Sequence, residues 1–367
     1  MSKSPENITS FVLFGALGDL SLHKLIPAWY YLERENMLSD ELKILGVARQ
    51  DLTKEQFQKK ILGALNSFVA SEYLDDDVCT KLLGRLDYCC CDLQRPESYP
   101  NLEQSLKGWS KPIAYYLAIS PSLFEQVCDG LNSINILTSL SRIVVEKPIG
   151  YDLESSKEIN SKLLKHFTES QIYRIDHYLG KETVQNLIAL RFANSLFSSQ
   201  WSNKGIESVE ITAAESVGIE DRWGYFDGVG QMKDMVQSHI LQLLCLIAME
   251  PPNRLNDQGI RSEKVKVLES LKPLGEAEIE KNFVTAQYAD GEILGTKVPG
   301  YTNEKNAQNA SETETFVSIK AEIQNWRWSG VPFYLRTGKR MASKTTQIVV
   351  QFKSDGHYIF DQKREKL

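Results

Sequence analysis

The stretch that decides the fold is SFVLFGALGDL, residues 10–20. Its first five residues form a short apolar run with β-branched and aromatic side chains, which is typical of a buried strand. Two glycines follow, Gly15 and Gly18, and a helical pattern starts at about Ser21. A second buried-strand run covers residues 42–49. Strand, glycine turn, helix and strand in this order predict a βαβ unit, which implies a parallel sheet.

The chain changes character near residue 176. Before it, further buried-strand runs at 113–119, 142–146 and 171–176 alternate with helical or loop segments, as in a doubly wound sheet. After it, we expect a strand, one long helix and several strands of alternating apolar and polar residues, which indicate an antiparallel sheet with one covered face. The runs concerned are 208–214, 230–249, 283–288, 314–323 and 347–352.

These patterns predict two domains. We expect residues 1–176 to form an α/β Rossmann-like dinucleotide-binding domain. We expect residues 177–367 to form an α+β domain with a mainly antiparallel sheet.

Composition excludes several classes of protein. The 42 Lys and Arg against 48 Asp and Glu give a net charge of −6, so we expect no bulk attraction to nucleic acid or anionic membranes. No stretch approaches the roughly 18 apolar residues of a membrane span, and the polar start lacks a secretory h-region. The six cysteines show no C-x-x-C spacing, so we expect reduced cysteines, no metal site and a cytoplasmic protein.

The glycine turn is a candidate phosphate loop. Gly15 and Gly18 would let the backbone approach a pyrophosphate, while the next helix N-terminus supplies N–H groups. The loop lacks a full G-x-G-x-x-G pattern, so by itself it also fits an ordinary strand–helix turn. Arg49 stands at the end of the second strand, where NAD-binding folds place an acid, and an arginine there favours the 2′-phosphate of NADP. The alternative is a solvated arginine.

Two polar motifs follow later strands of the first domain. EKPIG, residues 146–150, closes a strand at its carboxyl end, where α/β sheets bind ligands, so Lys147 is a candidate contact or part of a plain turn. RIDHYLGKE, residues 174–182, is the densest polar cluster in the chain. In it, Asp176 could orient an imidazole. The donors that suit a phosphate dianion are His177, Tyr178 and Lys181.

The second half holds weaker candidates. His239 lies in the predicted helix 230–249, with Asp234 five residues earlier. In an α-helix those five residues turn by about 500°, so the two side chains would lie roughly 140° apart and flank a ligand. A lone helical histidine is more often structural, and Glu215 could be a surface carboxylate. The basic loop RTGKRMASK, residues 336–344, hints at an anionic ligand in a net acidic chain.

FGALGDL, EKPIG and RIDHYLGKE in this order resemble the glucose-6-phosphate dehydrogenase family, most of all its bacterial members. RIDHYLGKE is highly specific to that family, and VPFYLRTGKR agrees with it. The likeness runs from about Ser10 to Phe352. It implies an NADP-dependent oxidation of glucose 6-phosphate to 6-phosphogluconolactone, the first oxidative step of the pentose phosphate pathway.

The resemblance also implies residue roles. His239 matches the general base, and Asp176 matches the carboxylate that holds it. The implied coenzyme contacts are Gly15, Ala16, Gly18, Asp19, Leu20 and Arg49, with Lys147 between coenzyme and substrate. The residues implied around the sugar phosphate are His177, Tyr178, Lys181 and Lys344. The residues implied around the sugar hydroxyls are Glu215, Asp234 and Lys339.

Three departures from the family pattern qualify this reading. Leu17 stands where many members have a polar residue, and Leu22 and His23 replace basic residues, so we expect weaker coenzyme-phosphate contacts. The chain stops at Leu367, before further strands and helices of the family, so we expect an incomplete second domain with unpaired strand edges that favour aggregation. The resemblance also implies that residues 177–367 hold the substrate and the dimer contacts, so a homodimer or homotetramer is expected if the fold is completed.

Two other functions stay open. The first is a truncated, non-catalytic paralogue that binds nucleotide or a full-length subunit. The second is a related dehydrogenase acting on free glucose, which the retained cluster at 177–181 disfavours.

Overall fold

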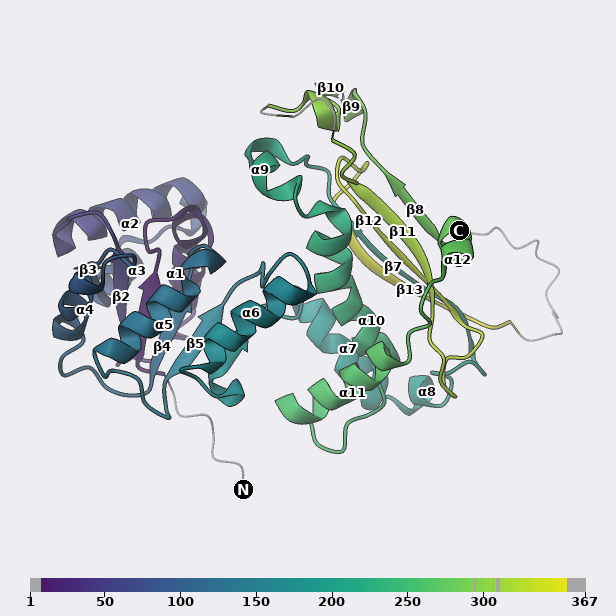
Figure 1. The fold of residues 1–367 in the computed structure, drawn as a ribbon, viewed down its shortest axis with the longest axis horizontal. Helices are drawn as coiled ribbons and strands as arrows, with labels where there is room; N and C mark the ends of the chain where they lie inside the picture. Colours follow the sequence, from purple (N-terminus) through teal and green to yellow (C-terminus); the bar gives the residue numbers. More distant parts are fainter. Residues whose placement is uncertain (1–7, 294, 306, 308–310, 355–367) are drawn as a thin grey trace. The chain divides into compact units, whose positions relative to one another are not determined.

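The structure is a computed structural model that describes residues 8–293, 295–305, 307 and 311–354. The chain divides into two compact units, Met1–Ile175 and Asp176–Leu367 (Figure 1). None of the helices among the described residues is long and apolar enough to cross a membrane.

The first unit is built on a parallel sheet of six strands in the order β3-β2-β1-β4-β5-β6. Every neighbouring pair in it is parallel. This is the strand order of a Rossmann fold, so the predicted α/β Rossmann-like class is confirmed. The strands are β1 (Ser10–Phe14), β2 (Lys43–Ala48), β3 (Leu86–Cys90), β4 (Ile113–Leu117), β5 (Arg142–Val145) and β6 (Ile172–Arg174).

Helices cover both faces of this sheet (Figure 1). Alternation along β1 explains why: Val12 and Phe14 pack into one buried cluster, while Leu13 packs into another on the opposite face. The helices are α1 (Ile26–Arg34), α2 (Lys54–Phe68), α3 (Asp76–Gly84), α4 (Tyr99–Ser105), α5 (Phe124–Ser133) and α6 (Leu153–Leu164). Short turns are the π-helix η1 (Ser21–Leu25) and the 3₁₀ turns η2 (Ser71–Tyr73), η3 (Pro96–Ser98), η4 (Pro121–Leu123) and η5 (Glu169–Gln171).

The second unit is built on a five-stranded sheet in the order β13-β7-β12-β11-β8. The sheet is mainly antiparallel, as expected, but β12 pairs with β7 in parallel. Its strands are β7 (Ile206–Ala214), β8 (Phe283–Ala286), β11 (Phe316–Glu322), β12 (Pro332–Gly338) and β13 (Thr345–Phe352). A separate hairpin joins β9 (Gly291–Ile293) to β10 (Thr296–Val298).

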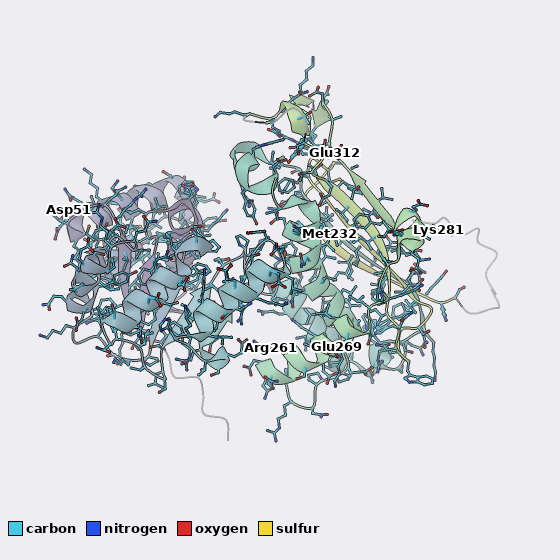
Figure 2. The ribbon with its side chains drawn as sticks, viewed as in Figure 1. Asp51, Met232, Arg261, Glu269, Lys281 and Glu312 are labelled. Carbon is cyan, nitrogen blue, oxygen red and sulfur yellow. The ribbon has the colours of Figure 1, made fainter. Side chains whose placement is uncertain are left out.

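Helices lie against one face of this second sheet (Figure 1). They include α7 (Glu182–Phe192), α10 (Leu241–Ala248) and α11 (Asp257–Glu269). The other α-helices described in this unit are α8 (Ser195–Ser198), α9 (Trp223–Phe226) and α12 (Glu276–Asn282). The unit also holds the 3₁₀ turns η6 (Glu220–Arg222) and η8 (Tyr301–Asn303) and the π-helix η7 (Met232–Ile240). Figure 2 labels Met232, where η7 begins.

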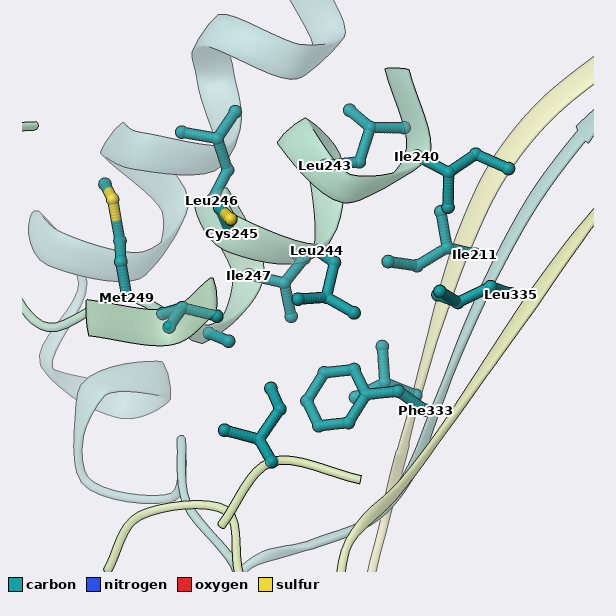
Figure 3. Close-up of a cluster of buried hydrophobic side chains, with 14 of the residues drawn as sticks. Ile211, Ile240, Leu243, Leu244, Cys245, Leu246, Ile247, Met249, Phe333 and Leu335 are labelled. Carbon is teal, nitrogen blue, oxygen red and sulfur yellow. The ribbon is translucent and has the colours of Figure 1, made fainter. Parts of the chain in front are cut away.

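The core of the second unit forms where α10 meets the sheet. Figure 3 shows Leu244 and Ile247 of α10 beside Phe333 and Leu335 of β12, with Ile211 of β7 next to them. All five side chains are buried. Because neighbouring residues of a strand point to opposite faces, β7 and β12 present alternate side chains to this core. The π-helix η7 runs directly into α10, so this core also holds η7 over the sheet.

The expected single helix 230–249 is two segments, because Met232–Ile240 is a π-helix and α10 follows it. In a π-helix each N–H bonds five residues back, so a turn holds more residues than in an α-helix. The roughly 140° separation expected for Asp234 and His239 assumed α-helical geometry and is wrong here. In a π-helix, side chains five residues apart point in more similar directions than they do in an α-helix.

Candidate active site

The glycine turn after β1 is fixed by close backbone approach. Gly15 has a φ of +79°, and a Cβ there would lie 2.2 Å from the carbonyl oxygen of Ala118. The Gly15 and Ala16 N–H groups both donate to the Val47 carbonyl, at 3.0 and 3.1 Å. Only glycine satisfies both demands at position 15. The turn therefore joins the carboxyl ends of β1, β2 and β4.

A cavity of about 400 Å³ opens at these strand ends. The loop residues Gly15, Leu17 and Gly18 line it, together with Arg49 after β2 and residues 91–94 after β3. Its volume falls within the usual range of small-molecule sites. A bare glycine backbone beside an exposed arginine fits the phosphate-bearing adenosine end of NADP. Figure 2 labels Asp51, two residues beyond Arg49.

The lining residues 91–94 were missed by sequence reasoning. The preceding run LDYCC mixes polar and apolar residues, and its cysteines drew attention only as possible ligands. In the structure it is strand β3, which pairs with β2 and brings Asp92 to the cavity. All six cysteines are free. Predicting LDYCC as a strand next to β2 could have found these lining residues, because parallel neighbouring strands end at the same edge of the sheet.

Lys147 follows β5, the next strand along the same edge. The Lys147–Pro148 peptide bond is cis, and the Tyr116 hydroxyl donates a hydrogen bond to the carboxylate of Glu146. At Gly150, with φ +82°, a Cβ would lie 2.5 Å from the Ser156 nitrogen. The backbone around Lys147 is thus held on both sides. Its role as a ligand contact stays a prediction.

The second unit begins with a histidine–carboxylate pair. His239 Nδ1 lies 2.7 Å from Asp176 Oδ1, and the same oxygen accepts the Tyr178 N–H at 2.9 Å. Burial raises the pKa of Asp176, but the hydrogen bond and charge of His239 outweigh it, so the pKa falls below its usual value. An ionised carboxylate only accepts, so Nδ1 carries a proton, and in the neutral form of the ring Nε2 keeps its lone pair.

His239 is fully buried beneath two rings. The Tyr178 ring stacks on it at 4.3 Å with an interplanar angle of 20°, and the His177 ring meets it edge-on at 4.4 Å. Within the described residues, Nε2 is buried with no hydrogen-bond partner. A buried polar atom left unsatisfied is uncommon and costly. The imidazole is therefore oriented at one nitrogen and available at the other.

A cationic cluster lies next to these rings. Lys181 Nζ sits 3.5 Å from the Tyr178 ring centroid and donates to Thr346 Oγ1 at 3.3 Å. Burial and the nearby Lys344 both lower the pKa of Lys181. Two like charges held together favour an anion between them, because it would relieve their repulsion. Thr346, on β13, is a member of this cluster that sequence reasoning missed.

Glu215 and Lys339 form an ion pair at the end of the sheet. The parallel register sets Gly338 of β12 beside Ala214 of β7, so the two residues after these strands are neighbours. Lys339 Nζ lies 2.6 Å from Glu215 Oε2, and the lysine is buried. Asp234 of η7 is buried as well. The unit therefore collects carboxylates and a lysine suited to sugar hydroxyls.

The predicted residues thus fall into two groups. Those of the coenzyme loop, with Arg49 and Lys147, belong to the first unit. The second unit joins Asp176 to His239 and pairs Glu215 with Lys339. It also stacks Tyr178 on that imidazole and sets the His177 ring edge-on to it. A dinucleotide-binding fold in one chain with a histidine–carboxylate pair is the arrangement of a nicotinamide-dependent dehydrogenase.

Comparison with known proteins identifies one family within this class. A family model described as "Glucose-6-phosphate dehydrogenase, NAD binding domain" matches residues 12–186, and "Glucose-6-phosphate dehydrogenase, C-terminal domain" matches residues 188–367. The glucose-6-phosphate 1-dehydrogenase of Dickeya dadantii is 47% identical over 364 residues, covering 99% of this chain and 74% of the relative. That of Bacillus subtilis is 43% identical, covering 93% and 70%.

Solved structures agree with the sequence relatives. One described as "Glucose-6-phosphate dehydrogenase in complex with its substrate glucose-6-phosphate" superposes with a TM-score of 0.88 at 35% identity, covering 98% of this chain and 74% of that one. The enzyme from Mycobacterium avium gives 0.84 at 35% identity, covering 98% and 75%. The chain belongs to the glucose-6-phosphate dehydrogenase family.

Proposed function

We propose that this chain oxidises the C1 hydroxyl of glucose 6-phosphate to 6-phosphogluconolactone with NADP, the first oxidative step of the pentose phosphate pathway. The observation that carries the proposal is the 2.7 Å contact between His239 Nδ1 and Asp176 Oδ1. The nicotinamide ring, when bound, supplies the hydride acceptor. Everything else that the reaction needs is proton transfer and positioning by this chain's own side chains.

His239 is the proposed general base. Oxidising an alcohol requires removal of its hydroxyl proton, and the Nε2 lone pair of His239 can take it. Histidine changes its charge near neutral pH, which suits this task. Asp176 holds Nδ1–H, so it fixes the tautomer and stabilises the imidazolium that forms. Nε2 is buried with no hydrogen-bond partner among the described residues, so the sugar hydroxyl would supply the partner that it lacks.

The phosphate and hydroxyl contacts are proposed for separate clusters. His177, Tyr178, Lys181 and Lys344 would bind the sugar phosphate, because paired lysines and ring donors suit a dianion. Glu215, Asp234 and Lys339 would bind the sugar hydroxyls, because a hydroxyl can donate to a carboxylate and accept from a lysine ammonium. This division would select a phosphorylated sugar over free glucose.

NADP would be bound in the first unit. Gly15, Ala16, Gly18, Asp19 and Leu20 supply the turn that meets the diphosphate, at the carboxyl end of β1. Arg49 lines the same cavity and would pair with the 2′-phosphate. We further propose that Lys147 lies between coenzyme and substrate.

We also propose a cytoplasmic homodimer or homotetramer. Six free cysteines suit a reducing compartment. Apolar side chains remain exposed on strands of the second sheet, at Val284, Tyr334 and Val349, and an exposed apolar face marks an interface. Light scattering of the purified chain measures its oligomeric state directly.

A direct absorbance assay tests the function. Purified chain, glucose 6-phosphate and NADP should produce absorbance at the NADPH band, whereas glucose in place of its phosphate should give far less. Asp176→Asn, purified in the same way, is the control for a contaminating enzyme. The measured rate should fall in this variant only if the activity belongs to this chain. A folded chain that binds NADP but never reduces it would instead support a non-catalytic paralogue.

A further inference from the structure

Arg340 follows Lys339 directly and has a backbone φ of +53°. Side chains other than glycine rarely adopt this left-handed region, and such strain persists only where the surroundings fix it. Here the Arg340 N–H donates to the Val217 carbonyl at 3.1 Å, and the Met341 N–H donates to the Glu215 carbonyl at 2.9 Å. The loop after β12 is thereby bonded to the loop after β7.

The Arg340 side chain enters a buried network away from the Lys339–Glu215 pair. Its Nη2 donates to Glu304 Oε1 at 2.9 Å, and the Tyr288 hydroxyl donates to the same oxygen at 2.9 Å. That hydroxyl also accepts the Ile219 N–H at 3.3 Å. The side chains of Arg340 and Glu304 are only 16% and 7% exposed. Two successive residues, Lys339 and Arg340, thus reach two different carboxylates.

This network is built for placement more than for stability. Burying an ion pair gains little over apolar packing, because both charges lose water. Among the described residues, Arg340 Nε is buried without a hydrogen-bond partner, so the pair is not fully satisfied. A Cβ on Gly218 would lie 2.4 Å from Glu304 Oε1 and 2.6 Å from Arg340 Nε. The segment after β7 therefore leaves room for this pair and no more.

We propose that Arg340, through Glu304 and Tyr288, is a positioning residue that holds Lys339 and Glu215 in place for the sugar hydroxyls. The inference rests on the proposed function, in which that pair contacts the substrate. Strand register sets the Lys339 and Glu215 backbones side by side, but it does not fix where the lysine amine lies. The bond from Arg340 to Glu304, which follows η8, ties the loop after β12 to a third segment. This tie restricts the positions that the neighbouring Lys339 can take.

Arg340→Met and Glu304→Gln test the proposal. Each should lower kcat/KM for glucose 6-phosphate about tenfold to a hundredfold, since small misplacements cost this much. The KM for NADP should change little, whereas the melting temperature should fall, because each change leaves a buried charge without its partner. Arg340→Lys should recover part of the loss, and the double variant should be little worse than either single one, because coupled residues are non-additive. Gly218→Ala should reproduce the defect with every charge retained.

Arg336→Met is the matched control. Arg336 lies on β12, four residues before Arg340, and in the part of the chain that the structure describes its side chain forms an exposed pair with Glu210 at 3.9 Å. Its loss should therefore leave the kinetics unchanged. Calorimetric binding of glucose 6-phosphate gives a second readout that does not need turnover. If Arg340→Met fails to fold, Glu304→Gln, which keeps the shape of the site, decides the question.

Two outcomes separate this inference from the proposed function. If folded Arg340→Met and Glu304→Gln bind and oxidise glucose 6-phosphate normally while Lys339→Met does not, the positioning role is overturned and the proposed function stands. If Lys339→Met is also normal, the substrate contact itself is wrong, and the positioning role is overturned with it. Weakened substrate binding in both network variants, with the Arg336 control unaffected, supports the proposal.

Discussion

Asp176 and His239 stand 63 positions apart in the chain, yet Asp176 Oδ1 accepts the His239 Nδ1–H at 2.7 Å. The carboxylate follows β6, and the imidazole comes from the π-helix η7. Because Asp176 Oδ1 also accepts the Tyr178 N–H, the carboxylate is fixed before substrate arrives. The lowered pKa of Asp176 keeps it ionised at neutral pH, as an orienting group must be.

Asp176→Asn should lower kcat while leaving much of the glucose 6-phosphate binding intact. An amide can present an N–H to the ring and so favour the wrong tautomer, which removes the lone pair from Nε2. The expected loss is smaller than that of removing the imidazole, because the base itself remains. Steady-state kinetics on the folded variant checks this, and a kcat equal to that of the unaltered chain would show that Asp176 does not orient the base.

Arg49→Ala should raise the KM for NADP far more than that for NAD. A hydrogen bond to a charged group contributes about 1.5–3 kcal/mol, which is roughly ten- to a hundredfold in affinity. Lys54→Ala is the charge-matched control, since Lys54 pairs with Asp87 and is not among the residues lining the cavity. Equal effects of Arg49→Ala on both coenzymes would remove the assignment of the 2′-phosphate to Arg49.

Lys181→Ala should chiefly raise the KM for glucose 6-phosphate, by about tenfold or more, because a charged contact to the phosphate is lost. Lys157→Ala, an exposed lysine on α6, should have no effect on either kinetic constant. An unchanged KM in folded Lys181→Ala would place the phosphate elsewhere.

Glu33 of α1 should make the stability of the first unit depend on acid. Its side chain is 1% exposed and lies 2.6 Å from Arg85 Nε and 2.9 Å from Lys81 Nζ. Burial raises its pKa, but the hydrogen bonds from these two cations lower it by more than burial raises it. The pKa of Glu33 therefore falls below its usual 4.5. The stabilisation is therefore present above pH 4.5 and is lost as the pH falls through the lowered value.

Glu33→Gln tests this ion pair by denaturant unfolding. At pH 7 the change should cost about 3–5 kcal/mol, because it leaves a buried arginine without its partner. The difference from the unaltered chain should shrink in acid, where Glu33 becomes protonated in both states. Glu125→Gln, in an exposed cluster with Lys162 and Lys165, should change stability little. A pH-independent difference would contradict the ion-pair explanation.

The sequence predicted most of the first unit because its strands are short apolar runs. The run 10–14 is β1 to the residue, and 42–49 contains β2. LDYCC was missed as β3 because its pattern is neither apolar throughout nor alternating. In the second unit, alternation predicted strands but not the parallel pairing of β12 with β7, since pairing depends on topology.

Parts of the site are invisible in the sequence for the same reason. Apolar periodicity predicts a helix at 230–249, but it does not say that Asp234 and His239 lie on a π-helical segment. The partners of Lys181 and Arg340, Thr346 and Glu304, come from distant segments without any motif. Family motifs named the residues that would touch ligands, whereas the groups that hold those residues required the fold.

The central claim is that His239 takes the substrate proton, and the turnover of His239→Asn tests it most directly. Positioned proton transfer contributes about 10²–10⁴-fold, so kcat should fall by that factor at pH 7.5. The KM for glucose 6-phosphate should change little, because the contacts proposed for its phosphate are other residues, His177, Tyr178 and Lys181. Combining it with Asp176→Asn should add little further loss. Near-normal turnover by a folded His239→Asn chain would contradict the account and leave His239 a structural residue.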